Sequence, residues 1–184
     1  MATQAAAAES ANADVAQLVV EREADGFYLT ASLQLELPPL VEDALQKGVP
    51  MFFVAETEIF RARWYWYDKR VLGVERHMRL AYQPLTRRWR LNVASGAITA
   101  NSLGVALNQS FETLAEALAA LRRISRWKIA DIAEIDPEQK YSVEFRFRLD
   151  ISQLPRPFQI GALGQADWNI ATTSSQRLSM QGAK

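Results

Sequence analysis

The chain has 184 residues, of which 49% are hydrophobic, and its 21 basic side chains equal its 21 acidic side chains in number. This composition fits one globular domain with a sizeable core, and a net charge of zero argues against a general nucleic-acid binder. The lack of cysteine excludes disulfides, thiolate metal sites and cysteine catalysis, and a single histidine excludes an all-histidine metal site within one chain.

The two ends of the chain are polar and predict little structure. Residues 1–14 are rich in alanine and predict a disordered leader, and residues 172–184 predict a flexible tail, so the single β-rich domain is expected over residues 15–171. The leader lacks the basic and apolar regions of a signal peptide, although its small residues are typical of a segment near a cleavage site. No apolar run approaches the roughly 18 to 20 residues that a membrane-spanning helix needs.

Between those ends, the first elements alternate with a period of two. Residues 17–22 and 27–36 predict two strands, and the Asp25-Gly26 pair between them is a strong hairpin signal. Pro38-Pro39 then predicts the start of a short helix, which Gly48 is expected to end.

Residues 51–67 predict the longest strand, and residues 71–82 predict the next one, with a turn at residues 68–70. Trp89, Leu91 and Val93 indicate the buried side of a further strand. Residues 94–109 are small and weakly patterned, and predict a loop or an irregular hairpin.

The last third begins with a helix that Ser110 is expected to cap, followed by a strand over residues 125–130. Residues 141–149 alternate without exception between apolar and polar side chains, which is typical of a half-buried strand. Asp150 is expected to cap a short turn at residues 152–154, and the prolines of the Pro155-Arg156-Pro157 segment predict an extended path that protects a sheet edge.

These elements predict a mainly β protein, an antiparallel β-sandwich with two short helices, for which an immunoglobulin-like arrangement is one candidate. The alternative is an α+β antiparallel sheet with the helices on one face. The helices are too few for the crossovers of a parallel sheet.

The chain also resembles a known bacterial family, called domain of unknown function 4390. The resemblance rests on ordered segments over roughly residues 27–170: ALQKGVPMFFVAETEIFRARWYWYDKRV, RHMRLAYQPLTRRWRL, SFETLAEALAALRRISRWKIAD, KYSVEFRFRLDISQLPRPFQ and a following DWN. It implies a periplasmic or envelope-associated protein, often encoded near a nitrogen-regulation-type sensor histidine kinase. It implies no catalytic residues, because the family has no established activity. An export signal is therefore expected upstream of residue 15 in the full gene.

The most unusual segment is RARWYWYDKR, residues 61–70, in which four aromatic residues lie among basic ones. On a strand, Trp64 and Trp66 would share one face and fill the core. The opposite face would present the candidates for contact with a partner, which are Arg61, Arg63, Tyr65 and Tyr67. Arginine stems beside aromatic rings suit an anionic or planar ligand, a peptide or a membrane interface.

Further basic residues are candidates for the same surface if the fold brings them to Arg61 and Arg63. Arg88 and Arg90 are the partner-binding candidates among them, and the wider set comprises Arg87, Arg122, Arg123, Arg126 and Lys128, with Trp89 and Trp127 nearby. The alternative is that these arginines are scattered over the surface and pair with nearby carboxylates.

The remaining polar residues do not form a catalytic constellation. Glu56 and Glu58 would point the same way from one strand, but strand neighbours of this kind commonly pair with basic residues opposite. His77 is expected to be an exposed strand residue, and Ser110 and Ser152 lack a base partner. The segment of residues 131–138 contains four acidic residues, but it lacks the glycine and the closing glutamate of a calcium loop. We expect no catalytic residue, no metal and no cofactor.

Two classes of function follow. The first is a non-catalytic extracytoplasmic binding or signalling accessory module, such as an input partner of a membrane sensor kinase, whose partner is a protein or a membrane surface and not nucleic acid. A lipid or small-molecule carrier is a variant of it, with an apolar cavity as its signature. The second is an envelope-acting enzyme that uses only carboxylates and arginines. The lack of an acid–base constellation favours the first class.

Overall fold

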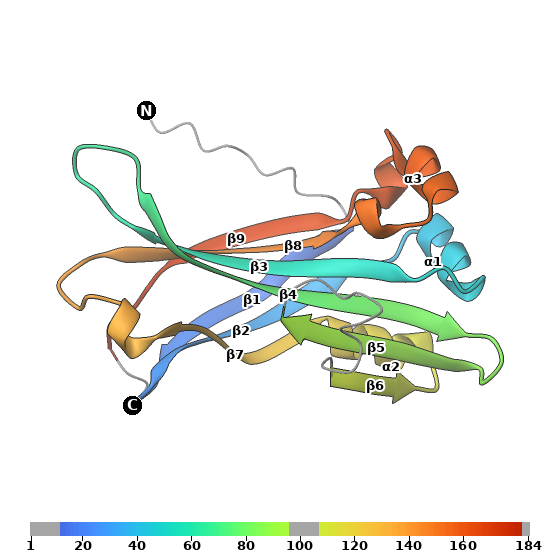
Figure 1. Ribbon diagram of the computed structural model, residues 1–184, viewed down its shortest axis with the longest axis horizontal. Helices are drawn as coiled ribbons and strands as arrows, with labels where there is room; N and C mark the ends of the chain where they lie inside the picture. The colour runs from blue at the N-terminus through green and yellow to red at the C-terminus, as the bar shows by residue number, and fades with distance from the viewer. Residues whose placement is uncertain (1–11, 96–106, 182–184) are drawn as a thin grey trace.

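The computed structural model describes residues 12–95 and 107–181, which form two antiparallel sheets and three short α-helices (Figure 1). The prediction of a mainly β sandwich is confirmed. The smaller sheet has the order β1-β2-β7, and its strands are β1 (Ala13–Arg22), β2 (Gly26–Leu35) and β7 (Arg123–Asp131). This order, three strands facing six, differs from the four-on-three arrangement of immunoglobulin domains.

The larger sheet has the order β6-β5-β4-β3-β8-β9. Its strands are β6 (Leu107–Phe111), β5 (Arg88–Ser95), β4 (Lys69–Gln83), β3 (Met51–Arg61), β8 (Tyr141–Leu149) and β9 (Ala171–Arg177). The helices are α1 (Pro39–Gln46), α2 (Leu114–Leu121) and α3 (Arg156–Ala162), with 3-10 turns η1 (Ile132–Glu134), η2 (Ile151–Gln153) and η3 (Ala166–Trp168). Among the described residues, no helix has the length and apolar character needed to cross a bilayer.

The core lies between the two sheets and follows the alternation of the strands. In β8 every second side chain is buried, as the sequence predicts, and the rings of Phe147 and Phe53 stack with their centroids 5.5 Å apart. One continuous apolar cluster contains residues of both sheets and of α1 and α2. Each central strand of the larger sheet therefore has one face in the core and the other face directed away from the smaller sheet.

The longest predicted strand is shorter than expected. β3 ends at Arg61, and residues 62–68 form a loop that projects from one end of the molecule (upper left in Figure 1). The prediction that Trp64 and Trp66 fill the core is wrong, because their side chains are 94% and 69% exposed. The pairing with β8 stops at Tyr141, opposite Arg61, so residues beyond Arg61 have no neighbouring strand on that side. Alternation selects a face only where something covers that face.

The hairpin predicted at Asp25-Gly26 joins β1 and β2, and the Glu23 N–H donates to the Gly26 carbonyl at 2.8 Å. Gly26 is needed for a close approach, because a Cβ at this position would collide with the Ala130 carbonyl oxygen of β7. The glycine thus allows β7 to pair with the end of β2.

Two helices lie close to their predicted places, and a third was not predicted. α1 begins at Pro39, and Gly48 follows it with a φ of 88°, as expected. Ser110 lies in β6, and the cap of α2 is Thr113, which forms a capping box with Glu116. The extended path predicted around the two prolines is wrong, because Pro155 is the N-cap of α3, where a fixed φ suits a helix start.

The tail expected at residues 172–184 contains most of β9. This strand pairs with β8, and Thr172 and Leu178 are buried. Its threonines and serines lack the apolar alternation by which strands are recognised, because β9 lies at the edge of its sheet. The predicted leader reaches into β1, which begins at Ala13, and residues 1–11 lie outside the described part of the chain.

The opposite exposures of Trp64 and Phe147 predict opposite effects on stability. Phe147→Ala should lower the free energy of unfolding by about 3 to 5 kcal/mol, because it leaves a cavity in the core. Trp64→Ala should change it by less than about 0.5 kcal/mol, because the ring has almost no contact to lose. Urea titrations of both variants test this, and a loss above about 2 kcal/mol for Trp64→Ala would show that the loop packs on the domain.

Candidate functional site

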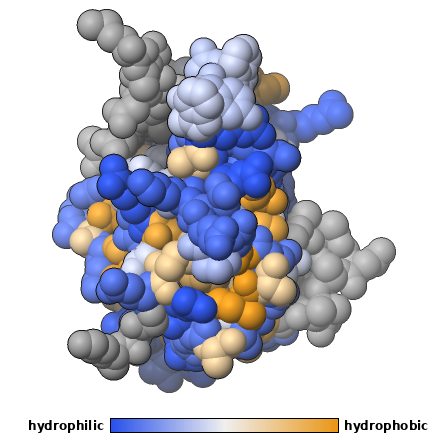
Figure 2. All heavy atoms as spheres, turned by 90° about the vertical axis from the view of Figure 1, so that its left-hand side faces the viewer, coloured by the Kyte–Doolittle hydropathy of each residue, from blue (hydrophilic) through white to orange (hydrophobic). Residues whose placement is uncertain are grey.

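The loop between β3 and β4, residues 62–68, contains a cluster of four exposed aromatic residues. We call it the aromatic loop. Its four aromatic side chains are largely exposed, and Trp64 and Tyr67 reach 94% and 84%. Figure 2 looks onto this end of the molecule, where hydrophobic patches lie among hydrophilic residues. Large aromatic rings in water are costly unless they serve a contact.

Local contacts hold the loop together. The Ala62 N–H donates to the Lys140 carbonyl at 2.9 Å, and the Arg63 N–H donates to Asp68 Oδ1 at 3.4 Å. The rings of Trp64 and Tyr65 meet edge to face at 5.1 Å between centroids, and Trp66 and Tyr67 do so at 6.0 Å. The aromatic rings therefore pack mainly on one another and present their remaining surface outward.

The base of the loop carries an excess of positive charge. Arg61, Arg63 and Lys69 have no ion pair among the described residues, whereas Arg70 binds Glu58 at 2.6 Å. Asp68 is the acidic residue of the loop, and its carboxylate accepts the backbone hydrogen bond from Arg63. The predicted candidates Arg61, Arg63, Tyr65 and Tyr67 are thus brought together, joined by the two tryptophans that were expected in the core.

The other two partner-binding candidates lie far from the loop. Arg88 pairs with Gln83 at one end of β4, while Arg61 pairs with Lys69 at the other end of this 15-residue strand. At about 3.3 Å a residue, the two ends are roughly 45 Å apart. Arg88 and Arg90 therefore belong to a different surface from the aromatic loop.

The wider set of basic residues does not converge on the loop either. Arg122 donates to the Leu35 carbonyl, Arg126 binds Glu23 at 2.7 Å, and Lys128 binds Asp131 at 2.6 Å. Trp89 and Trp127 are buried. These groups hold strands and turns together, as the alternative interpretation of scattered, paired arginines predicts.

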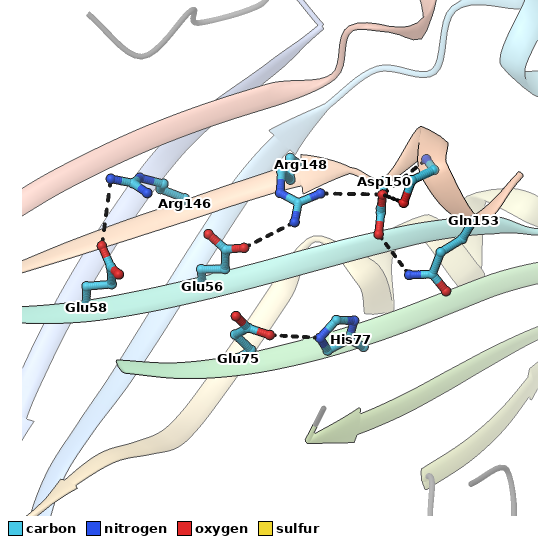
Figure 3. A network of polar contacts seen from close by, with 9 residues as sticks. Glu56, Glu58, Glu75, His77, Arg146, Arg148, Asp150 and Gln153 are labelled. Carbon is cyan, nitrogen blue, oxygen red and sulfur yellow. Dashed lines mark hydrogen bonds and ion pairs between the residues drawn. The ribbon is translucent and has the colours of Figure 1, made fainter. Parts of the chain in front are cut away.

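The outer face of β3 and β8 carries a ladder of opposite charges (Figure 3). Arg148 binds Glu56 at 3.2 Å, and Arg146 lies 3.8 Å from Glu58 and also pairs with Glu144. The expectation that Glu56 and Glu58 pair with basic residues opposite is confirmed. Pairs of this kind stabilise a sheet modestly, and they occupy the carboxylates that a hydrolytic site would need.

The Arg70 side chain crosses Gly73 on its way to Glu58. A Cβ at position 73 would meet the Arg70 guanidinium, so a larger residue there would require this flexible side chain to move.

Asp150 closes the ladder at the end of β8. Partial burial opposes ionisation, but hydrogen bonds from Gln153 and Ser152 and the nearby Arg148 hold the pKa of Asp150 below its ordinary value. Its carboxylate accepts from the Ser152 N–H at 3.2 Å and from Gln153 Nε2 at 2.8 Å, which confirms the predicted cap of the turn after β8.

The remaining sequence candidates have structural partners. The prediction that His77 is exposed is wrong, since its side chain is only 12% exposed, and its Nε2 lies 3.1 Å from Glu75 on the same strand. The Ser110 hydroxyl accepts from Arg88 Nε at 3.3 Å. In the acidic turn, Asp136 accepts from the Glu138 N–H at 2.9 Å. Within residues 12–95 and 107–181, no three acidic or histidine side chains gather in the manner of a metal site.

A family model described as a domain of unknown function, DUF4390, matches residues 10–178. The chain belongs to the DUF4390 family. No curated protein and no solved structure matches it. DUF4390 membership agrees with the resemblance seen in the four ordered segments, and the matched range includes every strand from β1 to β9.

Sequence patterns did not reveal one partly buried cation of this DUF4390 chain. Arg76 lies on the core side of β4, and its guanidinium stacks over the ring of Trp127 at 5.0 Å from the centroid. Burial lowers the pKa of Arg76. The contact links the two sheets, because Trp127 belongs to β7. The alternation of β4 places Arg76 on the same face as Met78, and this pattern in the sequence could have indicated that Arg76 faces the core.

The bonds of Asp150 predict a pH-dependent contribution to stability. Because its pKa is lower in the folded chain than the ordinary 3.8, folding gains from the carboxylate above that value and loses this gain as the pH falls through the folded pKa. Asp150→Ala should cost about 1 kcal/mol at pH 7, and the difference from the wild type should shrink below pH 4.

Urea titrations at pH 7, 5 and 3 measure this difference. Asp150→Asn is the matched control, because it keeps an acceptor oxygen but has no titratable group, and it should lose less at pH 7 than Asp150→Ala. A difference for Asp150→Ala that stays constant down to pH 3 would contradict the assignment.

Proposed function

We propose that this chain is a non-catalytic extracytoplasmic binding module that docks on an anionic membrane surface through the aromatic loop. The observation that carries the proposal is the exposure of Trp64, Tyr65, Trp66 and Tyr67 on a projecting loop with unpaired cations at its base. The extracytoplasmic location is supported by the resemblance of the chain to an exported family.

The chemistry of the loop suits the interface of a bilayer. Tryptophan and tyrosine concentrate at the level of the lipid headgroups, where their rings are partly buried and their N–H and O–H groups stay hydrated. Arg61, Arg63 and Lys69 would lie beside the headgroups, and each basic residue near an anionic surface contributes about 1 kcal/mol. Both interactions act together without a preformed cavity.

The size and shape of the loop favour a membrane over a protein partner. A standard protein interface takes about 20 to 30 residues from each partner. Residues 62–68 are only seven residues, and the loop projects away from the rest of the sheet (Figure 1). A membrane accepts such a tip with no matching surface on the body of the domain.

The two alternative functions have less support. In the enzyme hypothesis Glu56 and Glu58 would be the carboxylates, but both contact arginines of the sheet. In the carrier hypothesis an apolar cavity would lie inside the domain, whereas the space between β3 and β8 and the smaller sheet contains the stacked rings of Phe53 and Phe147.

Vesicle cosedimentation tests the proposal. The chain should bind vesicles that contain phosphatidylglycerol more strongly than vesicles of phosphatidylcholine alone, and added salt should weaken the binding. Trp64→Ala with Trp66→Ala should weaken binding by about a hundredfold, since burying each ring contributes at least about 1.4 kcal/mol.

The matched control is Ile160→Ala with Leu163→Ala, which removes two exposed apolar side chains at α3 and should leave binding unchanged. Equal binding by the tryptophan variant and the wild type would refute the role of the loop. Failure of the wild-type chain to bind any protein-free vesicle would refute the membrane and point to a protein partner, such as a membrane sensor kinase.

A further inference from the structure

A second surface feature lies at the β4–β5–β6 edge of the larger sheet, away from the aromatic loop. It is a hollow of about 450 Å³ on the outer face, and its lining residues, all of polar or charged type, are Arg79, Gln83, Arg90, Asn92, Asn108, Gln109 and Ser110. We call it the arginine hollow. The surface is hollowed here because the two residues that pair with Arg90 on the neighbouring strands, Ala81 and Ser110, have small side chains.

The strand register brings two guanidinium groups to this hollow. Arg79 of β4 pairs with Asn92, and Ala81 pairs with Arg90, so the two arginines are diagonal neighbours on one face of adjacent strands. Neither arginine has an ion pair among the described residues, and no acidic residue lines the hollow. On the same face of β8, in contrast, Arg146 and Arg148 both contact carboxylates.

Arg79 is partly withdrawn from water. Its side chain is half-buried, and its guanidinium lies 5.9 Å from the centroid of the Phe52 ring. Burial lowers the pKa of Arg79, because it partly removes the charge from water. A cation that is partly desolvated and has no counter-ion gains more than a fully hydrated one when an anion arrives.

Three of the uncharged side chains of the hollow already accept a hydrogen bond. Asn108 Oδ1 accepts a hydrogen bond from Asn92, Ser110 Oγ accepts from Arg88, and Gln83 Oε1 accepts from Thr86. Each of these groups therefore keeps its own N–H or O–H hydrogens for a ligand. The hollow presents donors from three strands and two positive charges, which is the complement of an oxyanion with several acceptor oxygens.

We propose that the arginine hollow binds a phosphate monoester. Two guanidinium groups match a group that carries about −1.5 to −2 charges at pH 7, better than they match a single carboxylate. Arginine also binds phosphate oxygens in a bidentate manner. The hollow has room for a small polar organic group beside the phosphate. The phosphate could belong to a free metabolite or to a lipid headgroup, which share this chemistry.

The proposal does not depend on the membrane function of the aromatic loop, because the hollow and the loop lie at different places along β4. If the loop variants still bind vesicles, the membrane proposal fails but the phosphate proposal for the arginine hollow does not. If the hollow binds no phosphate, the membrane proposal is likewise unaffected.

Isothermal titration with inorganic phosphate and with glycerol 3-phosphate, at constant ionic strength, tests the site. The wild-type chain should bind both, with the monoester tighter. Arg79→Gln and Arg90→Gln should each weaken binding by about tenfold, since each removes hydrogen bonds to a charged group. The matched control is Arg156→Gln with Arg177→Gln, which removes two exposed arginines that do not line the hollow and should change nothing.

Arg90→Gln keeps the test decisive if the Arg79 variant is unstable, because Arg90 is exposed and its loss should not affect folding. The proposal fails if the wild type binds neither compound, or if the control weakens binding as much as the hollow variants do. Vesicles with phosphatidic acid separate the two sources: weaker binding of Arg90→Gln to them indicates a lipid headgroup, and unchanged binding indicates a soluble monoester.

Discussion

The packing of the larger sheet on the smaller one is the constraint from which the other features follow. Rings such as Phe53, Phe145 and Phe147 are buried only where something covers them, so one face of each central strand is committed to the core. The β3–β4 hairpin continues beyond its pairing with β8, and the same kinds of side chain then face water. The aromatic loop is thus apolar in composition but has no core to join, which makes it available to a partner.

The opposite face of the larger sheet does not contact the smaller sheet, and it carries charge. Over β3 and β8 that charge is neutralised within the sheet, since Glu56 and Glu58 meet Arg148 and Arg146. Over β4 and β5 it is not, since Arg79 and Arg90 face a hollow without a carboxylate. A net charge of zero therefore conceals an uneven distribution. The division arises from strand order, which places acidic residues beside some arginines and polar uncharged residues beside others.

Sequence patterns predicted what is local. Period-two alternation located β8 and its buried residues, the prolines and Gly48 located α1, and Asp150 indicated its own cap. Sequence patterns did not predict features that depend on contacts between segments far apart in the chain. The end of β3 depends on where β8 stops, and the separation of Arg88 and Arg90 from Arg61 depends on register across three strands. The prolines before α3 fit both an extended edge and a helix start, so sequence could not distinguish them. For the candidate site, the residue types were identified correctly, but the faces of the two tryptophans were not.

The central claim is that the aromatic loop enters a membrane interface, and fluorescence measures this directly. Of the five tryptophans, Trp89, Trp127 and Trp168 are buried, while Trp64 and Trp66 are exposed on the loop. Vesicles of phosphatidylglycerol with bromine on the acyl chains near the headgroup quench only tryptophans that reach that depth. The account predicts quenching of the wild-type emission, with a shift to shorter wavelength, and neither effect when both loop tryptophans are replaced by phenylalanine. Wild-type emission unchanged by these vesicles, while the chain cosediments with them, would contradict it.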